Sequence, residues 1–355
     1  MVFYRKYRPQ TLADIDKEEV RRRLSFILSS SRGIPHAFLF CGPKGTGKTS
    51  AARILAKAVN CLKRTSEVKE VEPCNRCSQC LSITNGANLD VLEIDAASNR
   101  GIDEIRELRD KIRLAPISSR YKVYIIDEVH MLTTEAFNCL LKTLEEPPAH
   151  AIFILATTES HKLPETILSR CLRFDFGRAE KEEIIRALQR TVLGEKIKLP
   201  AEVLEMIAAS SDGSFRDGQK ILEEIAVLGL KTEEEVSKFL GRNIDSQVKK
   251  LLINLFKKNT KEALETLLLV YKEGANIKNL NEQVLETLHH LLLEKYGVKT
   301  AQNLSEGVNI TSFELRQLIE IFSKAYQELK AAAIATLPLE LAIIEWGEKK
   351  EGENV

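Results

Sequence analysis

Residues 42–49 constrain the fold of this chain more than any other stretch. They read GPKGTGKT and match G-x-x-x-x-G-K-[ST], the pattern of a phosphate-binding loop. The apolar run 37–41 before the loop predicts a buried strand, and the alanine-rich residues 49–59 after it have helical spacing. A chance glycine-rich turn would not place a strand before the loop and a helix after it. The sequence therefore predicts a nucleotide-binding α/β domain.

The residue types in this loop indicate which atoms meet a bound nucleotide. Glycines let backbone N–H groups turn toward phosphates, and the start of the following helix adds partial positive charge. We expect Lys48 to neutralise the β- and γ-phosphates of ATP, and the Thr49 hydroxyl to ligate Mg²⁺. The other residues of this stretch that are expected to bind the nucleotide are Gly42, Pro43, Gly45, Thr46, Gly47 and Ser50.

Two carboxylates follow the third predicted strand, an apolar run that is expected over residues 121–126. Asp127 is expected to hold Mg²⁺ directly or through water, and Glu128 to act as the general base that polarises the attacking water. An exposed acidic loop is the alternative, but an apolar strand of this kind after a phosphate loop favours the catalytic interpretation. His130 lies just beyond, and we expect it to be structural rather than catalytic.

Strands and helices alternate in the first half of the chain. Further strands are expected over residues 90–95 and 151–156, and a helix over 134–144. Another helix face is marked by Ile102, Ile105, Leu108 and Ile112. This alternation predicts a parallel sheet that is covered by helices on both faces.

The chain is too long for one hydrophobic core. Single cores stop growing at roughly 250–300 residues, and this chain has 355. From about residue 177 onward the apolar spacing is helical throughout. We therefore expect an α/β nucleotide-binding domain over residues 1–177, a small helical domain over 178–242 and an all-helical domain over 243–355.

Four cysteines interrupt the nucleotide domain between the phosphate loop and the acidic strand end. Cys74, Cys77 and Cys80 have the spacing of a tight metal knuckle, and Cys61 precedes them. Four thiolates form a closed tetrahedral site, so we expect one structural Zn²⁺ in a module at about residues 61–80. A redox pair or unliganded thiols are the alternatives. The remaining cysteines lie in or beside apolar segments and are expected in the core; they are Cys41, Cys139 and Cys171.

The charge balance of the chain gives no overall signal for nucleic acid or membrane. Lys plus Arg number 52 against 51 Asp plus Glu, which gives a net charge of +1. No run of about 18 apolar residues predicts a membrane span, and residues 1–9 lack the apolar segment of a secretion signal. A cytoplasmic location is expected, where disulfides are rare, and this favours metal ligation by the clustered cysteines. Any DNA contact must come from a local patch or from the assembly of several subunits.

Taken together, these motifs resemble the AAA+ clamp-loader ATPases, and within that family the bacterial DNA polymerase III branch. The resemblance covers most of the chain and is strongest over residues 4–222. The strings LEEPP at 144–148 and SRC at 169–171 are specific to clamp loaders, and the four cysteines mark the polymerase III branch. The other matching strings are YRP at 7–9, EIDAAS at 93–98, IDEVHML at 126–132 and LKT at 141–143.

The resemblance implies two further residues for catalysis. Thr157, at the end of the fourth strand, corresponds to a sensor of the γ-phosphate, and a threonine that caps the next turn is the alternative. Arg170 corresponds to an arginine finger that reaches into the ATP site of a neighbouring subunit, where such groups stabilise developing charge. Without the resemblance, Arg170 would be interpreted as a solvated surface residue.

The resemblance also implies residues that contact other parts of the nucleotide. Arg216 resembles the sensor of bound nucleotide in a helical lid, near a helix start that Ser214 caps. The family usually has alanine at the position of Gly218, and glycine there weakens a helix by up to about 1 kcal/mol. Tyr7 and Arg8 resemble an N-terminal segment that packs near the adenine, with a plain structural role as the alternative.

The function implied by the resemblance is that of an ATPase motor subunit of a clamp loader, a component of the DNA polymerase III holoenzyme. Such a subunit uses ATP with Mg²⁺, acts in a hetero-pentamer with other loader subunits, and places a sliding clamp onto primed DNA. Residues 178–242 would then form the lid and residues 243–355 the oligomerisation collar. Longer members of the branch continue into domains that bind helicase and polymerase, so a short form or a truncated chain is expected.

Two other functions remain open. One is an AAA+ ATPase of another DNA-processing type, such as a branch-migration helicase subunit, against which the four cysteines and residues 169–171 argue. The other is a nucleotide-dependent scaffold that binds without hydrolysing, against which Lys48, Asp127 and Glu128 argue. The outside of the zinc module is expected to offer a partner-binding surface whose partner the sequence does not identify.

Overall fold

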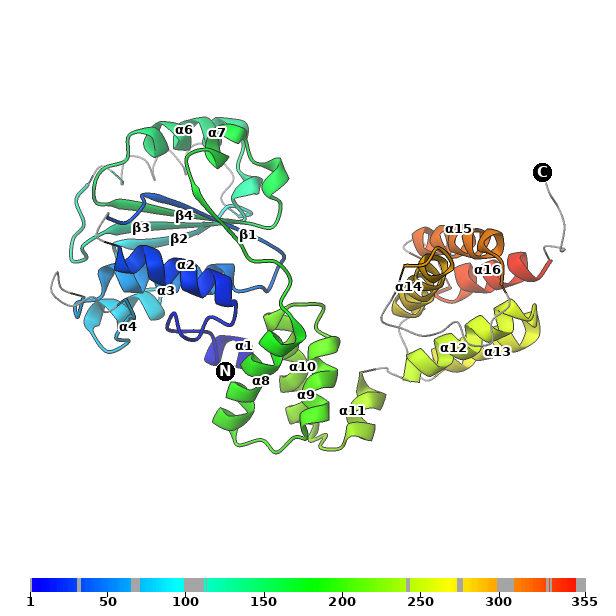
Figure 1. Cartoon of the computed structure of the whole chain (residues 1–355). Helices are drawn as coiled ribbons and strands as arrows, with labels where there is room; N and C mark the ends of the chain where they lie inside the picture. The colour runs from blue at the N-terminus through cyan, green and yellow to red at the C-terminus, as the bar shows by residue number, and fades with distance from the viewer. Residues whose placement is uncertain are drawn as a thin grey trace. The chain divides into compact units, whose positions relative to one another are not determined.

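The chain forms two compact units, Met1–Glu233 and Glu234–Val355, which are described separately (Figure 1). The computed structural model describes residues 2–30, 33–64, 71–98, 112, 114–240, 243–272, 277–298, 310–329, 332 and 334–348. The helix expected around Ile102, Ile105 and Leu108 lies outside these residues. Only Ile112 of that predicted face is described, and it is buried.

The first unit contains one parallel sheet of five described strands in the order β2-β3-β4-β1-β5. The strands are β1 (Ala37–Cys41), β2 (Val91–Asp95), β3 (Lys122–Asp127), β4 (Ala151–Thr157) and β5 (Leu172–Asp175). Every residue of β1 and β4 is buried, because helices cover both faces of a parallel sheet. The predicted parallel α/β sheet is therefore confirmed.

The sequence pattern does not predict strand β5. Its four residues read LRFD, and only Phe174 is buried, because the strand lies at the edge of the sheet beside β1. A four-residue run with two charged side chains lacks the continuous apolar character that marks the buried strands. Its existence depends on pairing with Phe38 to Cys41 rather than on its own composition.

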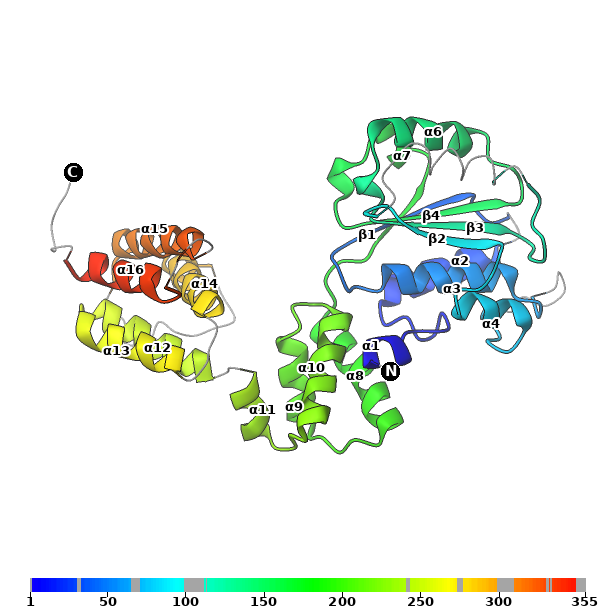
Figure 2. The same cartoon turned by 180° about the vertical axis from the view of Figure 1, so that it is seen from behind.

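Alternate residues of the central strands supply two separate cores. Phe38 and Phe40 of β1 pack beneath the sheet with α2 (Glu18–Ser29) and α3 (Lys48–Asn60). Leu39 and Cys41 pack on the opposite face with α6 (Thr134–Glu145) and α7 (Glu165–Leu168). Figures 1 and 2 show these two helical layers from opposite sides. Of the cysteines predicted to be core residues, Cys41 is buried in the second core, whereas Cys139 and Cys171 are partly buried and pack against it.

A helical part completes the first unit. It consists of α8 (Lys181–Glu195), α9 (Ala201–Ala209), α10 (Phe215–Leu228) and the start of α11 (Glu233–Phe239). The short N-terminal helix α1 (Phe3–Lys6) packs against α10. Segments from the two ends of this unit are therefore brought together beside the sheet (Figure 1).

Gly218 allows helices α8 and α10 to approach closely. It is buried in α10, and a Cβ atom at this position would lie 3.2 Å from Ile184 Cγ2 of α8. That distance is shorter than ordinary van der Waals contact, so an alanine would push the helices apart or force Ile184 to move. The low helix propensity of this glycine is offset by the close packing that it permits.

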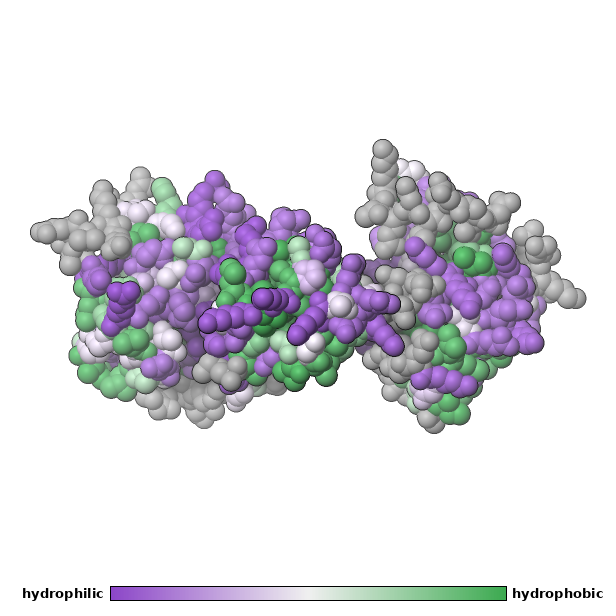
Figure 3. All heavy atoms as spheres, turned by 90° about the horizontal axis from the view of Figure 1, so that it is seen from below, coloured by the Kyte–Doolittle hydropathy of each residue, from purple (hydrophilic) through white to green (hydrophobic). Residues whose placement is uncertain are grey.

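The second unit is helical in all of its described elements. They are the rest of α11, α12 (Asn243–Phe256), α13 (Thr260–Lys272), α14 (Ile277–Lys295), α15 (Ser312–Glu328) and α16 (Leu337–Glu348). Helices α12 to α16 share one core that includes Trp346, whose Nε1 donates to the Leu255 carbonyl at 2.8 Å. Hydrophilic residues are interspersed with smaller hydrophobic patches on the face shown in Figure 3. Among the helices described, none has both the length and the apolar character that a bilayer crossing requires.

Candidate nucleotide and metal sites

A cavity of about 360 Å³ opens where the carboxyl ends of the strands meet the helical part of the first unit. Its size is that of a small-molecule site. The N-terminal segment, the phosphate loop, the ends of β2 and β3, and helices α8 and α10 all contribute to its lining. The predicted nucleotide-binding and catalytic residues that line it are Tyr7, Arg8, Gly45, Thr46, Gly47, Lys48, Thr49, Ser50, Asp127, Glu128 and Arg216. The predicted residues outside the lining are Gly42, Pro43, Thr157 and Arg170.

The phosphate loop is fixed by its glycines and by the helical part. Gly42, Gly45 and Gly47 have φ angles of 151°, 80° and 100°, which favour glycine. The Gly45 carbonyl accepts a hydrogen bond from the Phe215 N–H at 3.0 Å, and a side chain at Gly45 would collide with the Ser214 hydroxyl. The loop therefore rests directly on the start of α10.

Lys48 is a buried cation at the base of this loop. Its Nζ donates to the carbonyls of Gly42 and Pro43 at 2.6 and 2.8 Å. Burial lowers the pKa of Lys48, while the Glu128 and Asp127 carboxylates oppose that shift. Two neutral carbonyls compensate a buried charge less well than an anion does, so this position favours a phosphate group.

Thr49 and Asp127 form an oxygen pair across the cavity floor. The Thr49 hydroxyl donates to Asp127 Oδ2 at 2.8 Å. Asp127 ends β3 opposite Asp95, which ends β2. Mg²⁺ prefers hard oxygen ligands and keeps several waters, so one hydroxyl and one carboxylate beside a phosphate site fit its requirements. The donor set therefore agrees with the predicted Mg²⁺ ligands.

Glu128 is held in an unusual backbone conformation. Its φ angle is 48°, in the left-handed region that non-glycine residues seldom occupy. Its Oε2 accepts from the Thr158 N–H at 3.2 Å and from the Thr158 hydroxyl at 2.9 Å. Thr158 was not predicted as a site residue. The only signal in the sequence is its place directly after the strand-end threonine.

Thr157 is fully buried at the end of β4 and does not line the cavity. Its Oγ1 accepts from the Glu159 N–H at 3.0 Å, which is the turn-capping role that was the alternative interpretation. The same oxygen lies 3.0 Å from Nδ1 of His130, and this nitrogen lies 3.4 Å from Glu128 Oε2. His130 thus connects Thr157 to the predicted base, and the sensor role of Thr157 stays a prediction.

The N-terminal segment forms one wall of the cavity. The Arg216 guanidinium lies over the ring of Tyr4, 5.6 Å from its centroid, and Tyr4 was not predicted. Tyr7 packs so closely on Gly194 of α8 that a side chain there would meet its ring. Burial lowers the pKa of Arg8, and neighbouring guanidinium groups add to the effect. This wall presents aromatic rings and positive charge, which suit a nucleobase with attached phosphates.

Ion pairs fasten the same segment to α8. Asp16, whose side chain is 6% exposed, receives two hydrogen bonds from Arg190 at 2.8 and 2.5 Å. The Lys17 ammonium lies 3.1 Å from the Glu183 carboxylate. A bidentate arginine–carboxylate pair has a fixed geometry, so the N-terminal wall and the helical part are held together around the cavity.

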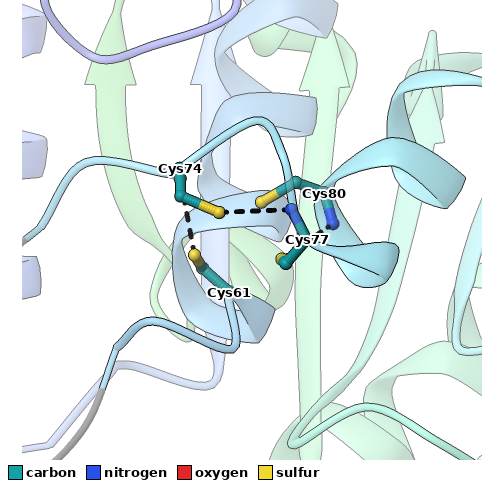
Figure 4. Close-up of side chains that lie close together, drawn as sticks. All are labelled: Cys61, Cys74, Cys77 and Cys80. Atoms are coloured by element: carbon teal, nitrogen blue, oxygen red, sulfur yellow. Dashed lines mark hydrogen bonds between the residues drawn. The ribbon is translucent and has the colours of Figure 1, made fainter.

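The four clustered cysteines converge as expected (Figure 4). Their Sγ atoms all lie within 4.8 Å of one another. Backbone N–H groups of Cys74, Cys77 and Cys80 point at the sulfurs of Cys61, Cys74 and Cys77 at 3.4–3.5 Å. Burial opposes ionisation of Cys74, but the Arg76 and Cys77 N–H groups outweigh it and lower its pKa to about 6. Four thiolate donors in this arrangement fit one tetrahedral Zn²⁺ with no open position.

Replacing Cys80 with serine is expected to release zinc and destabilise the first unit, because a closed site needs all four thiolates. A loss of about 3 kcal/mol would lower the melting temperature by roughly 6–12 °C in a unit of this size. Zinc content by a colorimetric chelator and melting by calorimetry measure both effects. Cys139→Ser, outside the module, is the control and should keep its zinc. A Cys80→Ser chain that retains one zinc ion would contradict the assignment.

Arg170 lies in the turn after α7, away from the cavity lining of its own chain. Its Nη2 donates to Glu145 Oε1 at 2.7 Å, and Nη1 donates to the Thr166 carbonyl at 2.9 Å. The side chain is 33% exposed. The geometry supports a fixed surface guanidinium, which is compatible with a function toward a neighbouring subunit.

Two family models match separate parts of the chain. The model described as DNA polymerase III, delta subunit, matches residues 17–180. The model described as DNA polymerase III subunits gamma and tau domain III matches residues 231–350.

Curated relatives match along most of the chain. The DNA polymerase III subunit gamma of Buchnera aphidicola subsp. Acyrthosiphon pisum is 35% identical, with 97% of each chain covered. The tau subunit of Bacillus subtilis is 43% identical over 96% of this chain and 62% of its own length. The Escherichia coli tau subunit is 37% identical over 90% of this chain and 49% of its own length. The chain thus spans about half to two thirds of these tau subunits.

Solved structures share the fold at lower sequence identity. A Thermotoga maritima RuvB Holliday junction branch migration motor has a TM-score of 0.50 and 19% identity, with 85% of this chain and 89% of that chain covered. This likeness shows the fold alone.

Proposed function

Because the chain belongs to the family of bacterial DNA polymerase III gamma and tau subunits, we propose that it is an ATPase motor subunit of a clamp loader. It binds and hydrolyses ATP with Mg²⁺ to open a sliding clamp and load it onto primed DNA, as one subunit of a hetero-pentamer. Residues 1–177 form the nucleotide domain, residues 178–242 the lid and residues 243–355 the collar. A cytoplasmic location stays a prediction.

The observation that carries the proposal is the meeting of Lys48, Asp127 and Glu128 in one cavity. A bound γ-phosphate would attract Lys48 Nζ away from the loop carbonyls, and Thr49 with Asp127 would hold Mg²⁺. The Glu128 carboxylate, held by Thr158, would then activate water. A buried cation, a metal-binding pair and a positioned carboxylate together support phosphoryl transfer to water.

The contact between the phosphate loop and α10 supports a motor function. Gly45 binds the Phe215 N–H, and Arg216, one residue further, lines the cavity. A change at the phosphates therefore acts on the helical lid through a hydrogen bond and a guanidinium. Differential contacts of this kind with ATP and ADP are what allow a nucleotide to shift a conformational equilibrium.

Apolar side chains on the second unit support its proposed function as a collar. Leu268 and Leu269 of α13 are 42% and 44% exposed, and Phe313 at the start of α15 is 53% exposed. Exposed large apolar groups beyond a filled core favour association with other chains. The surface is compatible with oligomerisation through this unit.

The proposal is preferred over a branch-migration motor because the matching family models and curated relatives are polymerase III subunits. The four-cysteine module agrees with that branch. A scaffold that binds without hydrolysing is disfavoured because Glu128 and Lys48 are both in place.

ATP hydrolysis by the full chain with partner loader subunits, sliding clamp and primed DNA tests the proposal. Turnover is expected to rise when clamp and primed DNA are both present, and to be lost in Lys48→Ala. Lys63→Ala, a surface lysine outside the cavity lining, is the matched control. A rate that ignores clamp and DNA would contradict loading, and no hydrolysis with every partner present would favour the scaffold.

A further inference from the structure

The four-cysteine module contacts the N-terminal wall of the nucleotide cavity through a buried lysine. Lys57, on α3, is 1% exposed. Its Nζ donates to the backbone carbonyl of Gln10 at 2.8 Å, to Gln10 Oε1 at 2.7 Å and to Asn75 Oδ1 at 2.7 Å. An ammonium group has three donors, and all three have an acceptor here. A buried charge satisfied in this way fixes the groups around it, because losing one acceptor is costly.

Asn75 belongs to the metal knuckle itself. It lies between Cys74 and Cys77 with a left-handed φ of 53°. The side-chain Nδ2 also reaches the Gln10 carbonyl at 3.3 Å. The position of Asn75 Oδ1 is therefore set by the same turn that places the metal ligands.

Gln10 transmits this contact to the cavity wall. Its Oε1 accepts from Lys57, and its Nε2 donates to the Arg8 carbonyl at 3.1 Å. Arg8 and Pro9 line the cavity immediately before Gln10. A second link lies beside the first, because the Glu72 carboxylate accepts from the N–H groups of Leu12 and Ala13 at 2.7 and 2.9 Å.

We propose that the zinc module is a positioning device for nucleotide binding, and that it holds the Tyr7–Pro9 wall of the cavity through the hydrogen-bonded chain Asn75–Lys57–Gln10–Arg8. The inference rests on the proposed ATP site. The phosphate loop contacts the start of α10 directly, so its position does not depend on this series of hydrogen bonds. Loss of the module or of Lys57 therefore weakens contacts to the nucleoside while contacts to the phosphates remain.

Two variants of the full chain separate this positioning from a general effect on folding. Lys57→Met removes the ammonium and keeps an unbranched stem. Asn75→Gly removes one acceptor and keeps a residue that tolerates the positive φ. Arg76→Ala is the matched control, because Arg76 is in the same knuckle but is exposed. Zinc content is measured for each, and Asn75→Gly and Arg76→Ala should keep one ion per chain.

The discriminating measurement is the affinity for ATP compared with that for inorganic tripolyphosphate, by fluorescent-nucleotide titration and calorimetry. Loss of a hydrogen bond to a charged group is expected to weaken ATP binding about 10-fold, equivalent to ~1.4 kcal/mol, in either variant. Tripolyphosphate affinity should change less than about 2-fold, since the phosphate loop is unaltered. Amide hydrogen exchange over residues 7–13 should accelerate in both variants. Chelating the zinc should weaken ATP binding by the unmodified chain, but it should cause little further loss of ATP affinity in Lys57→Met.

Equal affinity for ATP in the unmodified chain and both variants would overturn the inference. An equal loss for ATP and tripolyphosphate would also overturn it, because that pattern indicates general destabilisation. If Lys57→Met does not fold, Asn75→Gly decides the outcome. Failure of the unmodified chain to bind ATP would instead refute the proposed function, so the two failures are distinguishable.

Discussion

Replacing Glu128 with glutamine is expected to abolish steady-state ATP turnover and to leave ATP binding intact. A glutamine has nearly the same shape, and its amide oxygen can still accept from the Thr158 hydroxyl, as Glu128 Oε2 does at 2.9 Å. It cannot take a proton from water, so the general-base contribution is lost. Such contributions are typically about 10²–10⁴-fold in rate. The measurement is phosphate release at saturating ATP, with partner subunits, clamp and primed DNA present.

Glu135→Gln is the matched control for this experiment. Glu135 lies exposed near the start of α6, outside the cavity lining, and carries the same change of charge. Its turnover should equal that of the unmodified chain. Nucleotide affinity, measured separately, should be within a few-fold for all three chains because the phosphate contacts proposed for Lys48 are retained. A Glu128→Gln chain that keeps more than about a tenth of the turnover would exclude Glu128 as the base.

The parts of the fold that sequence predicts well are those with a local pattern. The strand, loop and helix around residues 37–60 and the four-cysteine knuckle each carry their signal in a short stretch. Glycine at positions 42, 45 and 47 allows the backbone of the loop to adopt positive φ angles. Such features follow from backbone sterics and ligand spacing, so no knowledge of distant contacts is required.

The features that sequence does not predict depend on contacts between distant residues. Thr158 becomes a site residue only because β4 lies beside β3, which brings it to Glu128, 30 positions earlier. Gln10 and Lys57 are 47 positions apart, and neither has a motif. Strand β5 exists through pairing with β1. In each case the packing of segments that are distant in the sequence, which no single segment encodes, creates the contact.

Replacing Arg170 with alanine is expected to lower turnover in the assembled complex by about 10³–10⁵-fold, the range for arginine fingers that act in trans. ATP binding should be retained, because Arg170 does not line the cavity of its own chain. Its guanidinium is already oriented by Glu145 and the Thr166 carbonyl, so little side-chain freedom is lost on docking. Phosphate release by the complete complex is compared with that of the unmodified assembly.

The isolated chain distinguishes a finger in trans from a residue that supports its own fold. If Arg170 acts on a neighbour, the low basal rate of the separate chain should be the same with and without the substitution. Arg173→Ala, which removes an exposed guanidinium from the adjoining strand, should leave the assembled rate near that of the unmodified complex. A loss of basal rate and melting temperature in the isolated Arg170→Ala chain would show that the contact with Glu145 is structural. Equal rates for the assembled variant and the unmodified complex would reject the finger, because a charge absent from the transition state contributes nothing to its stability.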